Sequence, residues 1–302
     1  MATPLLRSLR QGLPHTHIVV AGKAPYAALL EGLSSFDSFL ALDDRTSHAQ
    51  VLRAAHADTA LLLPNSWSSA IAAWRAGIPQ RIGRRHQGRS VLLQKTLPPI
   101  PGAAPMTELY ADFLPALGLA REVLPAELVV TAAPVTPLPE GAAFLGVAPG
   151  AAFGPSKSYP LPLLQQCLEQ LFATFGVIPV WFGAPQEREL LEKLAAGLSF
   201  ASVLPQNHSL SEAKALLQRC QCVLAMDNGA RHMAAALHVP QIVLYGPTHP
   251  AWSAHALEST TILRREELDC LNCHLKVCPK ADHPCMNRIL PADVVRAVVK
   301  AL

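Results

Sequence analysis

The sequence predicts an α/β protein built from two doubly wound, Rossmann-like domains. Its 302 residues are too many for one ordinary core and suit two domains of about 150 residues each. Half of the residues are hydrophobic, which supplies two cores and excludes a mainly disordered chain. Short apolar runs alternate with longer Ala- and Leu-rich segments, the pattern of βαβ units around parallel sheets. Residues 130–143 are rich in Pro, Thr and Ala without periodicity, which predicts a linker between the halves.

In the first half, strands and helices are expected to alternate three times. The chain departs from this order at its start, because Pro4–Gln11 predicts a helix where a doubly wound domain normally opens with a strand. We expect Thr59–Leu63 (TALLL) to be a buried strand. The predicted strands are His17–Ala21, Ser35–Leu42 and Thr59–Leu63, and the predicted helices are Ala24–Leu33, Ser47–His56 and Trp67–Ala76.

The alternation restarts after the linker, so we expect domains at 1–135 and 144–302. Ligands of such folds bind at the carboxyl ends of the strands, and two such domains would face each other across a central cleft. The predicted strands are Phe144–Val147, Val177–Phe182, Cys222–Ala225 and Gln241–Tyr245, and the predicted helices are Pro162–Phe175, Gln186–Ala196 and Gly229–Leu237.

Composition narrows the classes of function. The 25 basic and 22 acidic residues leave a net charge of +3, too small to predict nucleic-acid binding. No apolar stretch reaches the roughly 18–20 residues of a membrane span. The first residues lack the apolar core and cleavage site of a signal peptide. We therefore expect a cytoplasmic protein with mostly reduced cysteines, and peripheral membrane contact stays open.

The segment Met226–Trp252 carries the first chemical motif. A predicted strand delivers Asp227, Asn228 and Gly229 to the start of a helix, whose first amides and dipole favour an anion. Gly229 permits close approach of a phosphate, and His232 lies one helical turn further on. The alternative is an ordinary helix start with Asp227 as its N-cap.

A second motif is the loop VAPGAAFGPSKSYP, residues 147–160. Its glycines and Lys157 follow a predicted strand, where a backbone loop and one cation suit a diphosphate. The spacing is not that of a Walker A motif. The alternative is a connecting loop with a solvated lysine.

These motifs, together with Leu62–Arg84, YGPTHPAW and the tail CMNRILPADVVRAV, resemble the ADP-heptose:lipopolysaccharide heptosyltransferases, glycosyltransferase family 9. The stretch Leu62–Arg84 is most similar to that of heptosyltransferase II. The resemblance covers nearly the whole chain in the family's order. It implies the GT-B architecture and inverting transfer of heptose from ADP-heptose to the lipopolysaccharide inner core. No metal is needed if a lysine and the helix dipole carry the diphosphate charge, so we expect that no cofactor is required. An acceptor at the cytoplasmic face of the inner membrane would bring the protein into peripheral contact with that membrane.

For the donor, the resemblance implies a role for five residues. Lys157 matches the lysine that binds the diphosphate, where a fixed cation stabilises the charge on the leaving ADP. Asp227, Asn228 and Gly229 match the segment that holds the sugar and phosphates, and His232 matches a histidine near the diphosphate. Lys157 and Asp227 are therefore the candidate catalytic residues.

Further sites follow from the same resemblance. Gly150 belongs to the donor loop, and Glu187 lies where the family often places a carboxylate on the nucleotide ribose. An acidic residue in a first helical turn is also favoured for structural reasons. Asn65, Ser66 and Arg84 fall in the acceptor-side domain, although Ser66 also suits a helix cap.

One family feature is missing from this sequence. The resemblance implies an N-terminal strand followed by a Gly-Asp pair whose aspartate is the general base, and the sequence has neither. We therefore expect that the chain begins at an internal methionine. The absent base leaves open the alternative of a catalytically silent nucleotide-sugar binding protein. A GT-B transferase for another nucleotide sugar is a second alternative, because the family does not fix the sugar. A dinucleotide-dependent oxidoreductase is disfavoured, since no G-x-G-x-x-G opens either half.

Two clusters have competing interpretations. Cys270, Cys273, Cys278 and Cys285 follow the spacing C-x₂-C-x₄-C-x₆-C, which suits a structural zinc ion or an iron–sulfur cluster, or else four reduced thiols in a loop. A basic run predicts a solvated loop or, near a membrane, a surface for phosphates; it comprises Arg81, Arg84, Arg85, His86 and Arg89.

Overall fold

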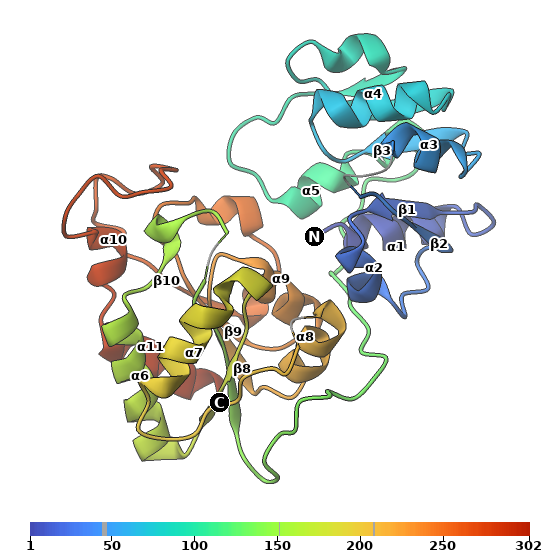
Figure 1. Ribbon diagram of the computed structural model, residues 1–302. Helices are drawn as coiled ribbons and strands as arrows, with labels where there is room; N and C mark the ends of the chain where they lie inside the picture. Colours follow the sequence, from blue (N-terminus) through green and yellow to red (C-terminus); the bar gives the residue numbers. More distant parts are fainter. Residues whose placement is uncertain (44–46, 151, 208) are drawn as a thin grey trace. The chain divides into compact units, whose positions relative to one another are not determined.

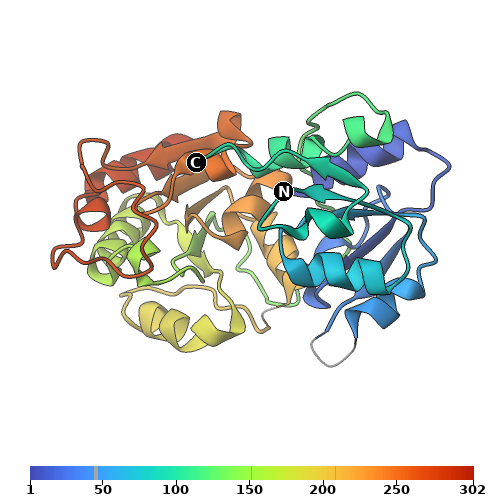
Figure 2. The ribbon, with the colours of Figure 1, turned by 90° about the horizontal axis from the view of Figure 1, so that it is seen from above.

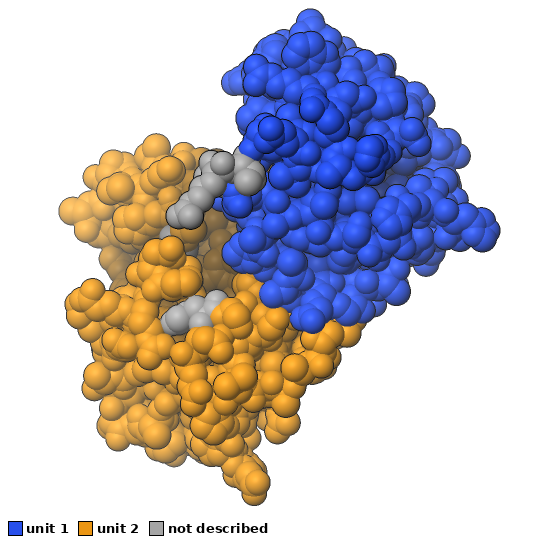
Figure 3. Space-filling view, turned by 45° about the vertical axis from the view of Figure 1, so that its right-hand side comes forward, with its two compact units in different colours: residues 1–127 blue, residues 128–302 orange. Residues whose placement is uncertain are grey.

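The chain divides into two units, Met1–Glu127 and Leu128–Leu302, coloured separately in Figure 3. The computed structural model describes residues 1–43, 47–150, 152–207 and 209–302. The predicted linker is bound to the second unit. The Leu128 amide donates to the Ala236 carbonyl at 3.1 Å, and the Val135 and Thr136 amides donate to the Glu212 carboxylate at 2.8 Å.

Unit 2 is a doubly wound domain around five parallel strands in the order β10-β9-β8-β6-β7. The three central strands, β6 (Phe144–Ala148), β8 (Cys222–Met226) and β9 (Gln241–Leu244), are buried along their whole length. Such continuous burial is expected of a parallel sheet with helices on both faces. The chain direction across the sheet reverses at β6, which has β7 on one side and β8 on the other.

Helices cover the sheet of unit 2 as the alternation predicted. α6 (Leu161–Phe175) and α11 (Pro291–Ala301) pack together, while α9 (Gly229–Ala236) packs on β8 and β9 beside α8 (Leu210–Leu217) (Figures 1 and 2). The main core joins residues of the strands with α6, α7 and α11. The remaining elements of the unit are η3 (Pro155–Lys157), β7 (Ile178–Trp181), η4 (Pro185–Glu187), α7 (Arg188–Ala196), η5 (Pro250–Ser253), η6 (Leu257–Ser259), β10 (Thr260–Leu263) and α10 (Pro284–Asn287).

Unit 1 contains two separate parallel sheets among its described residues, β1-β2 and β3-β4-β5. Leu5 and Leu9 of α1 share a core with Ile18, which precedes β1, and with Leu61 of β3. Its elements are α1 (Thr3–Gly12), β1 (Val19–Gly22), α2 (Pro25–Leu30), β2 (Ser38–Ala41), α3 (His48–Arg53), β3 (Thr59–Leu62), α4 (Trp67–Arg75), β4 (Gln80–Arg84), η1 (Arg89–Leu92), β5 (Lys95–Leu97), α5 (Met106–Ala111) and η2 (Pro115–Leu117).

Two expectations for unit 1 need correction. In β3 only Leu62 is buried, because β3 is an edge strand of its sheet rather than an interior one. In the basic run 81–89, a solvated loop is found only at residues 85–88, which are exposed, because residues 81–84 belong to strand β4. Three arginines of the run are buried and donate hydrogen bonds to backbone carbonyls: Arg81, Arg84 and Arg89.

Candidate active site

The predicted donor residues meet where the sheet of unit 2 changes direction. β6 and β8 are paired, with Ala148 opposite Ala225, so their carboxyl ends are level. β6 ends at Ala148, before η3 and Lys157, and β8 ends directly before Asp227. Loops diverge at such a switch point and leave a crevice, the usual ligand site of open α/β sheets.

Lys157 and Asp227 form a buried ion pair. The Lys157 ammonium donates to the Asp227 carboxylate at 2.6 Å and to the Asp227 carbonyl at 3.0 Å. The two side chains are 10% and 14% exposed, and the ammonium also lies 5.0 Å from the centre of the Phe153 ring. Lys157 is therefore not the solvated lysine of the alternative interpretation, and its position is held by a carboxylate.

Three hydroxyl groups surround the Asp227 carboxylate. Its oxygens accept hydrogen bonds from three hydroxyl groups, those of Thr248 at 3.0 Å, Ser253 at 3.1 Å and Tyr245 at 3.4 Å. Burial alone would raise the pKa of Asp227, but the hydrogen bond and charge of Lys157 and the hydrogen bond from Thr248 outweigh it, so the pKa lies below its ordinary value. Asp227 is thus an ionised acceptor that orients Lys157.

Asn228, rather than Asp227, is the N-cap of α9. Its side-chain oxygen accepts from the amides of Ala230 and Arg231, at 3.1 and 3.5 Å. Its side-chain NH₂ donates to the carbonyls of Ala148 and Gly150, which join the helix start to the end of β6. Two amides of the first helical turn are therefore occupied by the Asn228 side chain.

Gly229 faces open space at the start of α9. Apart from its chain neighbours and the backbone of α9, no heavy atom of the described residues lies within 4 Å of the position that a Cβ of Gly229 would take. A ligand can therefore approach the backbone of this helix end closely.

His232 belongs to a buried cluster with Arg231 and His255. The two imidazole rings stack with centroids 5.1 Å apart, and His232 Nδ1 lies 2.8 Å from His255 Nε2. The Arg231 guanidinium is fully buried and lies 3.1 and 3.2 Å from these same nitrogens. A guanidinium can only donate, so at least one ring nitrogen accepts from it.

This environment keeps both histidines neutral. Burial, the charge of Arg231 and the neighbouring His255 hold the pKa of His232 well below its ordinary value. Burial and Arg231 lower the pKa of His255 to about 4. Arg231 therefore supplies a permanent charge near Asp227 while the imidazoles remain uncharged at neutral pH.

Gly150 and Glu187 are in direct contact. A Cβ on Gly150 would lie 1.9 Å from a Glu187 carboxylate oxygen, so only glycine leaves room for this carboxylate. The other oxygen accepts from the Ala184 amide at 2.7 Å, at the start of η4. Glu187 thus has the structural role of the alternative interpretation and also lies against the donor loop.

Of the residues that the resemblance assigned to the acceptor side, the structure brings Asn65 and Ser66 together with Arg89. Ser66 is the N-cap of α4 and accepts from the Ser69 amide at 3.2 Å. Arg89 donates to the Asn65 side chain at 3.3 Å and to the Ser66 carbonyl at 3.1 Å.

Arg84 does not join this group. It is buried at the end of β4, where its guanidinium pairs with Asp112 at 2.5 Å and donates to the carbonyls of Leu109 and Pro98. Its charge is already compensated within unit 1.

The four predicted zinc cysteines are not assembled into a metal site. All are free thiols, and within the described ranges no group of three or more His, Cys, Asp or Glu side chains is close enough to hold a metal ion. Cys285 is buried against Gly246, whereas Cys273 is exposed. Burial, together with the neighbouring Cys278, Cys270 and Cys273, raises the pKa of Cys285 to about 11.

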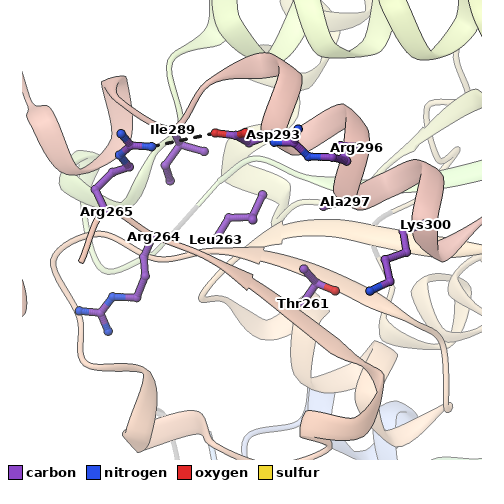
Figure 4. A pocket seen from close by; sticks show the side chains of 9 residues that line it. All are labelled: Thr261, Leu263, Arg264, Arg265, Ile289, Asp293, Arg296, Ala297 and Lys300. Atoms are coloured by element: carbon purple, nitrogen blue, oxygen red, sulfur yellow. Dashed lines mark hydrogen bonds and ion pairs between the residues drawn. The ribbon is translucent and has the colours of Figure 1, made fainter. Parts of the chain in front are cut away.

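A cavity of about 310 Å³ lies elsewhere in unit 2, between β10 and α11 (Figure 4). Leu263, Ile289 and Ala297 form its apolar wall, and Arg265 pairs with Asp293 at its rim. None of the predicted site residues lines it, and we assign it no part in the donor site.

Sequence reasoning missed the residues that hold the predicted ones in place. Thr248 lies within the stretch YGPTHPAW, and Ser253 directly follows it. Their polar side chains were the signal from which the sequence could have predicted these two residues. Arg231 and His255 are 24 positions apart, and only the fold brings them together.

Comparison with known proteins agrees with this geometry. The chain resembles solved glycosyltransferases in its fold: the structure of E. coli ADP-heptose LPS heptosyltransferase II is 23% identical and covers 99% of this chain and 93% of its own, with a TM-score of 0.81. Among sequences, lipopolysaccharide heptosyltransferase 2 of Escherichia coli (strain K12) is 28% identical over 292 residues, 87% of this chain and 84% of the relative. Lipooligosaccharide heptosyltransferase 2 of Haemophilus influenzae is 30% identical over 227 residues, 68% of this chain and 65% of the relative.

The fold and the comparisons define a GT-B glycosyltransferase with Rossmann-like units, so the predicted fold class and enzyme class are confirmed. The model of glycosyltransferase family 9 (heptosyltransferase) matches residues 45–283. The chain belongs to this family, as the resemblance implied.

Proposed function

We propose that this chain transfers heptose from ADP-heptose to the lipopolysaccharide inner core, with unit 2 binding the donor. The names of its relatives support the sugar and the acceptor. The observation that carries the assignment is the buried Lys157–Asp227 pair at the switch point of the sheet, beside the open start of α9.

The charges of the site suit a nucleoside diphosphate. Lys157 and Arg231 contribute two positive charges and Asp227 one negative charge, while His232 and His255 are neutral, so these groups together favour an anion. In this proposal Lys157 binds the diphosphate, and its charge counters the negative charge that develops on ADP as the bond to the anomeric carbon breaks.

Asp227 has a supporting role in this proposal. Its carboxylate is ionised and already accepts four side-chain hydrogen bonds, so it orients Lys157 rather than taking a proton from the acceptor. The acceptor hydroxyl attacks the anomeric carbon opposite the leaving ADP, which inverts the configuration. We assign no general base among the described residues.

The first test is calorimetric titration with ADP, ADP-heptose and UDP-glucose. Replacement Lys157→Ala should weaken ADP binding by about 1–3 kcal/mol, the range for a lost hydrogen bond to a charged group. The matched control is Lys193→Ala, which removes a lysine that is 71% exposed on α7 and should leave the affinity unchanged.

Each result has a defined meaning. Preference for the ADP compounds supports the proposal, and preference for UDP-glucose overturns the donor assignment while leaving the fold intact. An unchanged affinity in Lys157→Ala removes Lys157 from the site. Heptose transfer to a lipopolysaccharide acceptor distinguishes an enzyme from a silent binding protein, since both would bind ADP.

Membrane contact is a separate proposal for unit 1. No helix within the described ranges is long and apolar enough to cross a membrane. Residues 59–107 contain neither Asp nor Glu, and the exposed apolar side chains of this segment include Trp67, Trp74 and Val91. Aromatic and basic groups suit an anionic lipid surface. Co-sedimentation with anionic and neutral vesicles tests it, and equal binding to both would contradict it.

The zinc hypothesis and the expected independence from cofactors need measurements of metal content. Elemental analysis of the purified chain, followed by melting with and without a chelator, decides whether a structural metal is bound. A metal-free chain with unchanged melting ends the zinc hypothesis. Transfer activity that persists in the chelator supports a reaction without a metal cofactor.

A further inference from the structure

Residues 270–286, the cysteine-bearing segment near the C-terminus, bind the loop that carries Lys157. All three polar groups of Ser156, the residue before Lys157, bond to this segment. The Ser156 amide donates to the Lys276 carbonyl at 3.1 Å, and its hydroxyl donates to the Leu275 carbonyl at 2.6 Å. The Ser156 carbonyl lies 2.8 Å from His283 Nε2, which must carry the proton because a carbonyl can only accept.

The contact is close as well as polar. Ser156 is buried, and Gly154 passes so near the segment that a Cβ there would lie 2.6 Å from the Lys276 carbonyl oxygen. Gly154 also has a φ of 147°, which favours glycine. The backbone of Gly154 and Ser156, which precede Lys157, therefore packs closely against residues 275–283.

The same segment reaches the other side of Asp227. The His274 amide donates to the Pro247 carbonyl at 2.9 Å, and the next residue, Thr248, donates its hydroxyl to Asp227. Cys285 and Met286 lie against Gly246, where a Cβ would be 2.9 and 2.7 Å from their sulfur atoms. One segment thus contacts both loops whose side chains bind the Asp227 carboxylate.

We propose that His283 is a positioning residue for Lys157: its ring N–H holds the Ser156 carbonyl and thereby aims the Lys157 ammonium at the donor diphosphate. This inference rests on the proposed function of the Lys157 site. It gives the cysteine-bearing segment a role through its backbone and His283 that does not depend on its thiols.

The test compares ADP affinity among variants at this segment. His283→Ala should weaken ADP binding about 3- to 10-fold, as expected for one lost hydrogen bond. His283→Gln restores a side-chain N–H at similar reach and should bring the affinity back to within about 2-fold of the unchanged chain. Because residue 283 has a φ of 38°, the Ala and Gln variants share the same backbone strain, and their difference reports the N–H.

His274→Ala is the matched control. His274 lies in the same segment with a φ of 55°, its side chain is exposed, and its bond to Pro247 uses the backbone amide that alanine keeps. This variant should bind ADP like the unchanged chain. Melting temperatures of all variants separate a loss of affinity from a loss of fold.

A double-mutant cycle with Lys157→Ala shows whether His283 acts through Lys157. In the Lys157→Ala background, His283→Ala should cause no further loss of ADP affinity. An equal loss in both backgrounds, or wild-type affinity in His283→Ala, overturns the inference alone. An unchanged affinity in Lys157→Ala, or no ADP binding by the unchanged chain, overturns the proposed site and this inference together.

Discussion

Arg231 is the residue whose environment is least expected, since it is a fully buried cation whose side chain forms no ion pair among the described residues. Its guanidinium is bonded to His232, to His255 and to the His255 backbone carbonyl, and its Nε has no partner in the described part of the chain. Buried charges are costly unless compensated. An anionic ligand at Lys157 would partly compensate this charge, and the nearby Asp227 does so in its absence.

The two histidines beside Arg231 predict how stability depends on pH. The pKa of His255 falls from 6.5 in the unfolded chain to about 4 in the folded chain, so between these values only the unfolded chain binds the proton. Stability should therefore fall as pH falls through this window. Replacement His255→Gln should reduce the loss between pH 7 and pH 5 by about 1–2 kcal/mol, after allowance for solvent screening at a partly exposed ring.

Thermal melting at pH 7 and pH 5 measures this effect. The exposed His274 provides the control, because His274→Gln should keep the pH dependence of the unchanged chain. Identical pH dependence in His255→Gln would show that His255 is not held neutral by Arg231.

Among the elements, α9 matters most for the candidate site because its start, which follows β8, is bonded to the end of β6. Asn228 caps the helix with its oxygen and binds the end of β6 with its nitrogen, so one side chain fixes the helix relative to the donor loop. The sequence placed Asp227, Asn228 and Gly229 at a helix start. Asn228 is the residue that caps the helix, and its side chain is held by the carbonyls of Ala148 and Gly150, almost 80 residues earlier in the chain.

Removal of this cap should affect both stability and binding. Asn228→Ala should cost about 1–2 kcal/mol of stability. It should also weaken ADP binding, because the hydrogen bonds from Asn228 to the Ala148 and Gly150 carbonyls are lost. Ser209→Ala is the matched control, since Ser209 caps α8 through the Glu212 amide. It should cost about 1 kcal/mol and leave ADP affinity unchanged. Unfolding in urea and calorimetry measure the two effects, and equal ADP affinity in both variants would contradict the assignment.

At the scale of the whole molecule, the candidate donor residues all belong to unit 2 and the acceptor-side candidates to unit 1. The two units also differ in their sheets, since unit 2 has five strands in one sheet and unit 1 has separate sheets of two and three strands. The family model matches residues in both units, so the family assignment does not rest on unit 2 alone.

This division predicts where ADP stabilises the chain. At a free ADP concentration 100-fold above Kd, linkage should add about 2.7 kcal/mol to the stability of unit 2. Hydrogen exchange should slow in η3 and α9 and stay unchanged in residues 1–127. Slowed exchange in residues 1–127 would show that unit 1 takes part in nucleotide binding.

Much of the fold was predictable because local patterns decide it. The alternation of apolar runs located strands β1–β3 and β6–β9 within a few residues, and it located the helices that follow β3, β6 and β8. It missed β4, because the four arginines in QRIGRRHQGR are typical of a surface loop. The burial of Arg84 and Arg89 depends on backbone carbonyls from segments that the pattern does not connect.

By itself, the sequence determined the family, the two-unit α/β architecture and the residue types of the candidate donor site, because apolar periodicity and ordered motifs are local properties. Only the tertiary structure decided that Lys157 is paired with Asp227, that burial beside Arg231 keeps two histidines neutral and that residues 275–283 hold the Lys157 loop. These contacts join segments 23 to 127 residues apart. Their energies come from burial and from geometry that exists only after the chain has folded.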